Sequence, residues 1–533
     1  MKTANKNYDY YNHHRIDNLK ELLEYRLETS PDDIAIKYKE NNNVKTKTFR
    51  EVYNDVINLS GYFYKMYHNK HIAIIGENSY NFIIIYFAIV LSGNVCVILN
   101  KDLSKEDVLL WIKKSDSKVV YYSSYYCPFI KDLKIKSYPF EDMDEYMKIG
   151  RKTSNKYKID NDKDSTIFFT SGTTGANKCV VLSQKNIARD IYGAASLFLP
   201  SGTSVVSFLP YHHAFGFVTS MLKPYYYGCE LYLNKSLKYV ATDIKENKPE
   251  TLFVVPAFIE MFYKQIWKTA RKEKKDKKLK HMISLSNKML KMGIDIRKKL
   301  FKSLLNEFGG KLSYIICGGA YLPPKYVKWF RSIGIEILNG YGITECSPVV
   351  SVNRNEFHRD GSVGQICRDV DIKIIDNEIC VGGPIVMKEY YKDKKSTSKV
   401  IIDGYFHTGD LGYIDKDGFL FITGRKKDII ILSNGENISP EEIESDLLND
   451  KGVNEVVVYE EDNKIIASIF PNEDYLGDQE YFDNLIYEYN KTKPKNHQIS
   501  LVKVRNKEFE KNSSLKILRN KVIGGNRYEE WSY

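Results

Sequence analysis

The 533-residue sequence lacks the features that mark several large classes of protein. Its eight cysteines are scattered, with no Cys-x-x-Cys pair and no paired spacing with histidine, so we expect neither a zinc site nor disulfides and place the chain in a reducing cytoplasm. Residues 1–8 contain no apolar segment, so no secretory signal is expected. The longest apolar run, Phe82–Leu99, is interrupted by Ser92, Gly93 and Asn94 and is too broken to span a bilayer.

Internal repeats and long low-complexity linkers are also absent. The composition is otherwise ordinary for a globular protein, with 43% hydrophobic and 28% charged residues. Much of the net charge of +11 lies in one basic segment, Lys268–Lys280. This segment is either a solvated face or a contact for anionic lipid or CoA phosphates. No nucleic-acid recognition module accompanies it, so we expect no nucleic-acid partner and at most a peripheral membrane contact.

Predicted strands alternate with predicted helices over most of the chain. For example, the strands His71–Ile75 and Val95–Leu99 flank a helix over 79–92, and a long helical segment is predicted over 257–307. This alternation indicates βαβ units and a mostly parallel sheet. From about residue 362 the pattern changes to hairpins. Because the last segment has strand and helix signals of its own, we predict a domain boundary at 425/426.

A loop rich in glycine and hydroxyl residues is the first candidate site. The segment Thr170–Lys178 lies between two β-forming runs, 166–169 and 179–182. Gly172 and Gly175 let backbone N–H groups approach an anion, and the terminal lysine adds a positive charge. Its hydroxyl donors are Thr170, Ser171, Thr173 and Thr174. The Walker spacing is absent, so the alternatives are a polyphosphate loop of another kind and a plain surface turn.

A second candidate segment, Asn339–Glu345, follows the predicted strand 335–338 as a glycine-hinged loop. Tyr341 offers a ring for stacking on adenine, the Asn339 amide offers hydrogen bonds, and the Glu345 carboxylate suits Mg²⁺. Another strand-to-loop edge, Gly318-Gly319-Ala320, lets backbone approach a flat ligand.

Three further residues complete the set of candidates. Asp410 ends the segment 405–410 with a carboxylate suited to ribose hydroxyls, and Arg425 could reach the same sugar. Lys516 is a single cation far along the chain. Each of these features alone is more often an ordinary loop or a solvated side chain.

In this order and spacing, the motifs together resemble the adenylate-forming superfamily of acyl-CoA synthetases, peptide-synthetase adenylation domains and luciferases, over about residues 20 to 520. The segments 341–353, 284–302 and 434–444 resemble bacterial long-chain fatty acyl-CoA synthetases. The resemblance implies an α/β fold with two domains. Residues 1–425 would form a large N-terminal domain of βαβ-type sheets with a distorted β-barrel-like part, and residues 426–533 a small, mobile α+β lid that carries Lys516.

The resemblance also implies roles for individual residues. Thr344 would bind the α-phosphate, Glu345 the Mg²⁺ ion, and His213 would lie beside the acyl pocket. Lys516 would bridge the substrate carboxylate and the α-phosphate, and Lys427 would be the hinge. Asn434 and Gly435 would line the thiol tunnel. The residues assigned to ATP are Thr170, Ser171, Gly172, Thr173, Thr174, Gly175, Lys178, Gly318, Gly319, Ala320, Asn339, Gly340, Tyr341, Gly342, Asp410 and Arg425.

The sequence departs from the family pattern at a few positions. Leu515 precedes the lysine where glycine is usual, Asn177 and Cys179 flank Lys178 where proline and glycine are usual, and Gln184 replaces a common histidine. The first two departures resemble variation among long-chain synthetases, and they bear on the rate of adenylation.

The resemblance implies an enzyme that uses ATP and Mg²⁺ to activate a carboxylic acid and then transfers the acyl group to the thiol of CoA. A medium- or long-chain fatty acid is the expected substrate. One alternative is the loading of a fatty or aryl acid onto carrier-protein phosphopantetheine. The other is a non-catalytic descendant that binds acyl groups or nucleotides without turnover.

Overall fold

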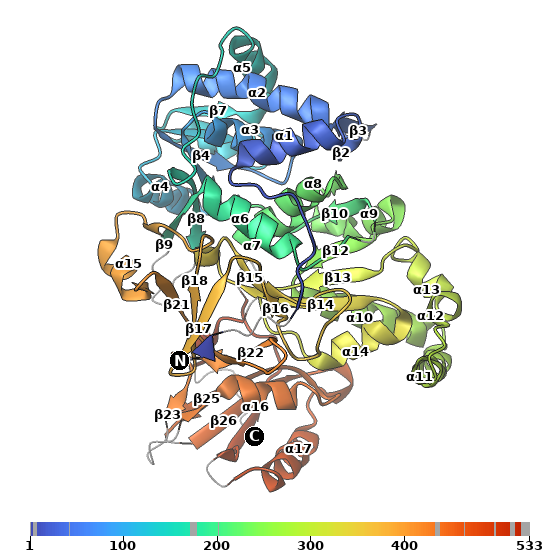
Figure 1. The fold of residues 1–533 in the computed structure, drawn as a ribbon. Coiled ribbons are helices and arrows are strands. Elements are labelled where there is room, and N and C mark those ends of the chain that lie inside the picture. Colours follow the sequence, from blue (N-terminus) through green and yellow to red (C-terminus); the bar gives the residue numbers. More distant parts are fainter. Residues whose placement is uncertain are drawn as a thin grey trace.

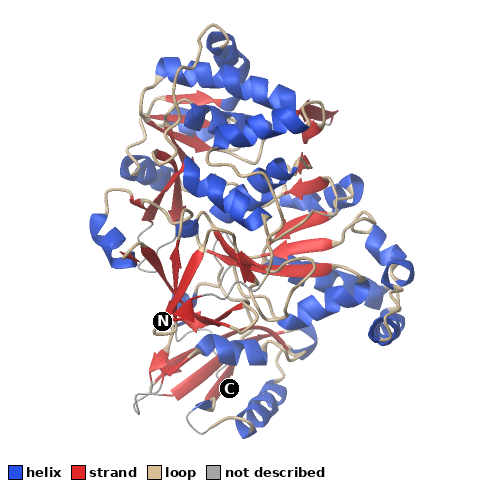
Figure 2. Cartoon of the chain, in the orientation of Figure 1, coloured by secondary structure: helices blue, strands red, loops and turns tan. Residues whose placement is uncertain are grey.

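The computed structural model of the chain describes residues 2–3, 8–41, 43–170, 178–200, 202–431, 437–462, 464–494, 497–511 and 517–523. In these ranges the chain forms three large sheets and a smaller C-terminal part (Figure 1). Helices pack on the outside of the sheets and between them (Figure 2).

The first sheet has seven strands in the order β19-β9-β8-β5-β4-β6-β7. Its strands are β4 (His71–Ile75), β5 (Val95–Leu99), β6 (Val119–Tyr122), β7 (Ser137–Pro139), β8 (Asp164–Thr170), β9 (Lys178–Ser183) and β19 (Glu389–Tyr390). The five strands from β8 to β7 are parallel, whereas β9 is antiparallel to β8. Strands β4 and β5 are almost wholly apolar and buried, as expected where helices cover both faces of a parallel sheet.

The second sheet has nine strands in the order β16-β15-β14-β13-β12-β10-β11-β2-β3. Its strands are β2 (Ile34–Glu40), β3 (Asn43–Thr48), β10 (Ser204–Ser207), β11 (Glu230–Leu233), β12 (Thr251–Val254), β13 (Tyr314–Cys317), β14 (Glu336–Gly342), β15 (Val349–Val352) and β16 (Gln365–Ile366). Strands β2 to β14 along this order are parallel, and β3, β15 and β16 are antiparallel to their neighbours.

A third, antiparallel sheet follows, with the strand order β1-β17-β18-β21-β20, and β22 pairs with β21 off this path. Its strands are β1 (Lys2–Thr3), β17 (Asp371–Ile375), β18 (Glu378–Gly382), β20 (Ile401–Ile402), β21 (Tyr405–Ile414) and β22 (Leu420–Arg425). Apart from β1, this sheet comes from the part of the chain, after about residue 362, for which hairpins are predicted.

Helices join the sheets into one body. Helix α6 contacts β8 and β9 of the first sheet and β15 of the second, so it packs between the two. The helices of this body are α1 (Leu19–Thr29), α2 (Phe49–Met66), α3 (Tyr80–Leu91), α4 (Lys105–Lys114), α5 (Met143–Gly150), α6 (Gln184–Ala195), α7 (Ala214–Phe217), α8 (Lys223–Tyr227), α9 (Val240–Asn247), α10 (Pro256–Lys272), α11 (Asp276–Lys291), α12 (Arg297–Leu300), α13 (Lys302–Asn306), α14 (Pro324–Ile333) and α15 (Lys394–Val400).

Residues from 430 onward have a hydrophobic cluster of their own, which includes Ile443, Val458 and Phe482. The elements of this part are β23 (Ile430–Ile431), β24 (Asn437–Ile438), α16 (Pro440–Leu447), β25 (Val453–Glu461), β26 (Lys464–Pro471), α17 (Gln479–Lys491), β27 (Leu501–Val504) and α18 (Arg519–Ile523). It lies at the lower end of the molecule in Figure 1. The boundary at 425/426 and the mobility of this part stay predictions.

Two local predictions were wrong. The helical segment 257–307 is not continuous: Lys274 and Gly293, both at positive φ, lie just beyond the ends of α10 and α11. Residues 339–342 are not a loop but the end of β14, because β13 pairs with Asn339 and β15 with 340–342. Among the described residues, no helix combines the length and apolar character that crossing a bilayer would require.

Helix α2 depends on a capping box at its N-terminus, where the Thr48 hydroxyl accepts a hydrogen bond from the backbone N–H of Glu51 and the Glu51 carboxylate accepts one from that of Thr48. Replacing Thr48 by alanine removes an acceptor for a helix-end N–H group. We expect a loss of about 1 kcal/mol in the free energy of unfolding, measured by urea denaturation. Thr48→Ser is the control and should stay near wild type; equal losses in both variants would contradict the role of the cap.

Candidate active site

A cavity of about 980 Å³ lies where several parallel strands end. The last residue of β8, Thr170, lines it, together with Val255 just after β12, Gly318 and Gly319 just after β13, and Tyr341 near the end of β14. Ligands of open α/β sheets bind at this edge. The opposite wall comes from β21 and β22 of the antiparallel sheet.

The cavity brings together most of the predicted site residues that the structure describes. Those that line it are Thr170, Lys178, His213, Gly318, Gly319, Gly340, Tyr341, Gly342, Thr344, Glu345, Arg425 and Lys427. Three others, Ala320, Asn339 and Asp410, do not line it. Eight predicted residues lie outside the described ranges: Ser171, Gly172, Thr173, Thr174, Gly175, Asn434, Gly435 and Lys516.

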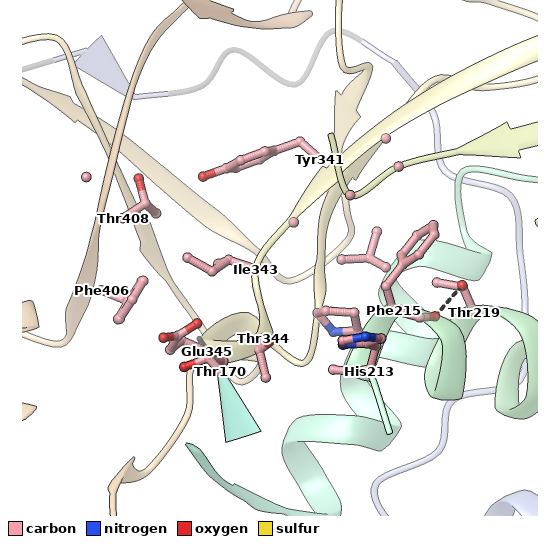
Figure 3. Close-up of a pocket in the computed structure, with 18 of the residues that line it drawn as sticks. Thr170, His213, Phe215, Thr219, Tyr341, Ile343, Thr344, Glu345, Phe406 and Thr408 are labelled. Carbon is pink, nitrogen blue, oxygen red and sulfur yellow. Dashed lines mark hydrogen bonds between the residues drawn. The ribbon is translucent and has the colours of Figure 1, made fainter. Parts of the chain in front are cut away.

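A buried carboxylate and two partners form one end of the cavity. Glu345 is 6% exposed, and its Oε1 accepts a hydrogen bond of 2.8 Å from the hydroxyl of Tyr390 in β19. The Nζ of Lys178, the first residue of β9, lies 4.3 Å from the centre of the Tyr390 ring. Burial raises the pKa of the Glu345 carboxyl, while the hydrogen bond from Tyr390 and the charge of Lys178 oppose that rise. Figure 3 shows Glu345 close to Thr170 and Thr344.

A second buried carboxylate, Asp410, lies behind the wall formed by Tyr341 and Arg425. The Tyr341 hydroxyl donates to its Oδ2 at 2.7 Å, and the Arg425 Nε lies 2.8 Å from its Oδ1. Asp410 and Arg425 are direct partners across β21 and β22, so strand register holds the pair together. Burial and the Asp410 charge raise the pKa of Tyr341, which keeps its hydroxyl protonated as a donor.

Two further residues of β14 lie in tightly packed surroundings. The Oδ1 atom of Asn339 is buried and has no hydrogen-bond partner among the described residues, although Asn339 does not line the cavity. Gly342 lines the cavity and lets the chain approach Pro348 closely, since a Cβ there would lie 1.8 Å from the carbonyl oxygen of Pro348.

His213 lies just before α7 and lines the cavity beside Phe215. Burial lowers its pKa to about 4, opposed by the charge of Asp102. The imidazole is therefore neutral near pH 7.

Sequence reasoning missed several polar residues of the site, three of which bear on its chemistry. Tyr390, Thr219 and Lys223 reach the cavity from β19 and from the helical run after His213. No motif signals Tyr390, because only the pairing of β19 with β9 brings it to Glu345. The spacing of Thr219 and Lys223, four residues apart on one helix, was the available signal for the other two.

A divalent cation fits this cavity only together with a ligand. The described residues contain no group of three or more histidine, cysteine or acidic side chains able to hold a metal. Mg²⁺ is commonly bound through one or two carboxylates plus substrate phosphates. The carboxylate of Glu345, near Thr170 and Thr344, is compatible with that arrangement.

A family model described as AMP-binding enzyme matches residues 23–391, and one described as AMP-binding enzyme C-terminal domain matches residues 427–530. The chain belongs to this family. It is thus a member of the adenylate-forming superfamily that its motifs resemble.

Curated relatives of the chain include ligases for long-chain fatty acids. It is 26% identical to the long-chain-fatty-acid–CoA ligase FadD15 of Mycobacterium bovis, over 75% of this chain and 72% of that enzyme. It is 28% identical to the chloroplastic long-chain-fatty-acid–[acyl-carrier-protein] ligase AEE15 of Arabidopsis thaliana, over 59% of this chain and 52% of that enzyme. The chain is 29% identical to the probable acyl-activating enzyme 16 of the same plant, and the match covers 69% of this chain and 59% of that enzyme.

The fold is that of solved adenylate-forming enzymes. The o-succinylbenzoate CoA synthetase of Bacillus subtilis in complex with its acyl-adenylate superposes with a TM-score of 0.73 at 24% identity, covering 96% of this chain and 99% of that one. The same enzyme with ATP and a magnesium ion gives a TM-score of 0.71 at 24% identity, covering 94% and 99%.

Replacing Tyr390 by phenylalanine tests the hydrogen bond to Glu345. The bond favours the charged carboxylate, so its loss should raise the pKa of Glu345 further. We expect the acidic limb of the pH–activity profile for ATP–pyrophosphate exchange to move to higher pH by about one unit.

Tyr391→Phe is the matched control. Tyr391 donates at 2.9 Å to Asp116, a residue that does not line the cavity, so its profile should stay at the wild-type position. An acidic limb that does not move in Tyr390→Phe would contradict the assigned hydrogen bond.

Proposed function

We propose that the protein is an ATP- and Mg²⁺-dependent acid–thiol ligase. It activates a medium- or long-chain fatty acid as an acyl-adenylate and transfers the acyl group to CoA. The main support is the convergence of Thr170 and Lys178, Glu345 and Arg425 on one cavity, from four separate strands or loops. The family and the names of the long-chain relatives agree with this chemistry.

The nucleotide would be held by the backbone after β13 and at the end of β14, and by polar side chains. Adenine would lie against Gly318, Gly319 and Ala320, stack on Tyr341 and give its amine to the unpartnered Oδ1 of Asn339. Because Gly340 and Gly342 have no side chains, the backbone of β14 could lie close to the adenine.

Asp410 would bind the ribose together with Arg425. Oδ2 of Asp410 accepts a hydrogen bond from Tyr341 and Oδ1 forms an ion pair with Arg425, and each oxygen has a further lone pair for a sugar hydroxyl. The loop 170–178 would hold the outer phosphates, and Thr344 would donate to the α-phosphate.

The first step is an in-line displacement at the α-phosphorus. A substrate carboxylate oxygen forms the new P–O bond as the bond to pyrophosphate breaks. The acyl carbon, which could otherwise lose only oxide, then carries AMP as a good leaving group. The chemistry that Mg²⁺ supplies, held by Glu345, is neutralisation of charge on phosphate oxygens. Lys178 and Lys516 add positive charge. No nucleophile of the enzyme is needed, because positioning and charge stabilisation suffice.

The second step is attack of the CoA thiol on the acyl-adenylate. A C–S bond forms, the C–O bond to AMP breaks, and the thiol proton is released. Lys516 and the incoming pantetheine need the same access to the carbonyl group, so the C-terminal part must turn about Lys427 between the steps. Asn434 and Gly435 would then line the tunnel for the thiol.

A carrier protein is the second candidate acceptor. The relative named as a long-chain-fatty-acid–[acyl-carrier-protein] ligase favours it. Both acceptors present the same phosphopantetheine thiol, so the adenylation step is shared.

Two assays test the proposal. Fatty-acid-dependent exchange of pyrophosphate with ATP reports adenylation. Absence of exchange would indicate a protein that binds acyl groups or nucleotides without turnover. Acyl transfer is then compared between CoA and a phosphopantetheinylated carrier protein at equal thiol concentration. We expect the CoA ester to form faster. Rapid carrier loading with little CoA ester would show that the acceptor is the carrier protein and not CoA.

Lys516→Ala separates the two steps. Because Lys516 stabilises charge only while pyrophosphate departs, we expect exchange to fall by on the order of 100-fold or more, while thiolysis of supplied acyl-AMP stays near wild type. Lys521→Ala is the control, since that exposed lysine pairs with Glu510 and should keep both steps. Equal loss of both steps in Lys516→Ala would refute the assigned role.

A further inference from the structure

One wall of the cavity is a helical run that contains a π-helical turn. Helix α7 continues through the turn η3 (Val218–Leu222) into α8. Phe215, Thr219 and Lys223 follow at four-residue intervals, and all three line the cavity. Figure 3 shows Phe215 and Thr219 on this wall, with the Thr219 hydroxyl bonded to the Phe215 carbonyl oxygen. π-Helical turns of this kind are frequent at functional sites.

Lys223 is an unusual residue in this position. Only 3% of its surface is accessible, yet it lines the cavity. Its ammonium group has three donors and makes no hydrogen bond or ion pair with any residue in the described ranges. Apolar residues also line the cavity, among them Val255, Phe258 and Val349.

The nearby carboxylate of Asp190 does not satisfy these donors. Asp190 lies on α6 and is 1% exposed. Its Oδ1 accepts a hydrogen bond of 2.7 Å from the backbone N–H of Val349, and its Oδ2 has no partner among the described residues. Burial lowers the pKa of Lys223, and the charge of Asp190 opposes that shift. Asp190 thus acts on Lys223 at a distance, while the donors stay open to the cavity.

A plain alkyl chain in this cavity would leave the ammonium group dry and without an acceptor, which is costly for a buried donor. An acyl chain with an oxygen at this depth would supply the missing acceptor. Lys223 lies ten residues beyond His213, or about 15 Å along a helix axis at 1.5 Å per residue. The matching oxygen therefore belongs far from the reacting carboxylate.

We propose that Lys223 determines substrate specificity by binding a second oxygen function, a carboxylate or a hydroxyl, near the far end of the acyl chain. The preferred acid is then an ω-oxygenated fatty acid. This inference rests on the proposed activation of a fatty acid and narrows its substrate class.

Pyrophosphate exchange with matched acids provides the test. Decanoic, dodecanoic and tetradecanoic acids are each compared with their ω-hydroxy and α,ω-dicarboxylic forms. We expect the wild-type kcat/KM for one oxygenated form to exceed that of the plain acid of the same length by on the order of 100-fold, because a buried donor then gains its acceptor. The hydroxy and dicarboxylic arms identify which oxygen function is bound.

The variant Lys223→Met should reverse this preference. We expect activity on the oxygenated acid to fall and activity on the plain acid to rise, with the KM for ATP unchanged. Lys223→Arg keeps donors at the site and should retain the wild-type order. A double variant, Lys223→Met with Asp190→Asn, removes both buried charges and controls for destabilisation by an unpaired Asp190; its preference should match that of Lys223→Met.

Two results would overturn the inference. One is a wild-type preference for the plain acids at every length. The other is an equal loss on all acids in both Met-containing variants while their melting temperatures stay at the wild-type value. Absence of exchange with every acid is a different outcome, since it would refute the proposed adenylation itself.

Discussion

The site depends on the burial of two carboxylates, Glu345 and Asp410, which only partners from other segments make tolerable. A charged group removed from water is costly unless it is paired and hydrogen-bonded. Each of the two accepts a hydrogen bond from a tyrosine, and Asp410 is also paired with Arg425. These partners come from three different sheets. The two carboxylates can therefore be buried beside the cavity only when the three sheets pack together.

Sheet topology explains how distant segments of the chain reach one another. The carboxyl ends of β8, β13 and β14 open on the same cavity, although they belong to two sheets. Helix α6 packs between those sheets and so sets their separation. The antiparallel sheet closes the remaining side, since β21 and β22 carry Asp410 and Arg425 in direct register. Fixed charges and donors are what the proposed adenylation requires, since that reaction needs positioning more than a nucleophile.

The C-terminal part rests against the large body through polar contacts. Lys264 of α10 bonds Asn454 at 2.5 Å, and Lys325 of α14 bonds the carbonyl oxygen of Leu448. The first of these contacts is exposed and the second is partly buried. Because this part also has its own hydrophobic cluster, its predicted mobility is compatible with the contacts that the structure shows.

The sequence by itself determined most of the local elements and the chemical groups of the candidate site. Apolar runs such as His71–Ile75 form strands because they must be buried, and the residues of Asn339–Glu345 follow a motif whose spacing is local. Only the tertiary structure decided which side chains meet. Pairing of β19 with β9 brings Tyr390 to Glu345, and the packing of α6 against the helical run after His213 leaves Lys223 at the cavity without a partner among the described residues. These contacts join residues far apart in the chain, and their geometry depends on how whole sheets and helices pack.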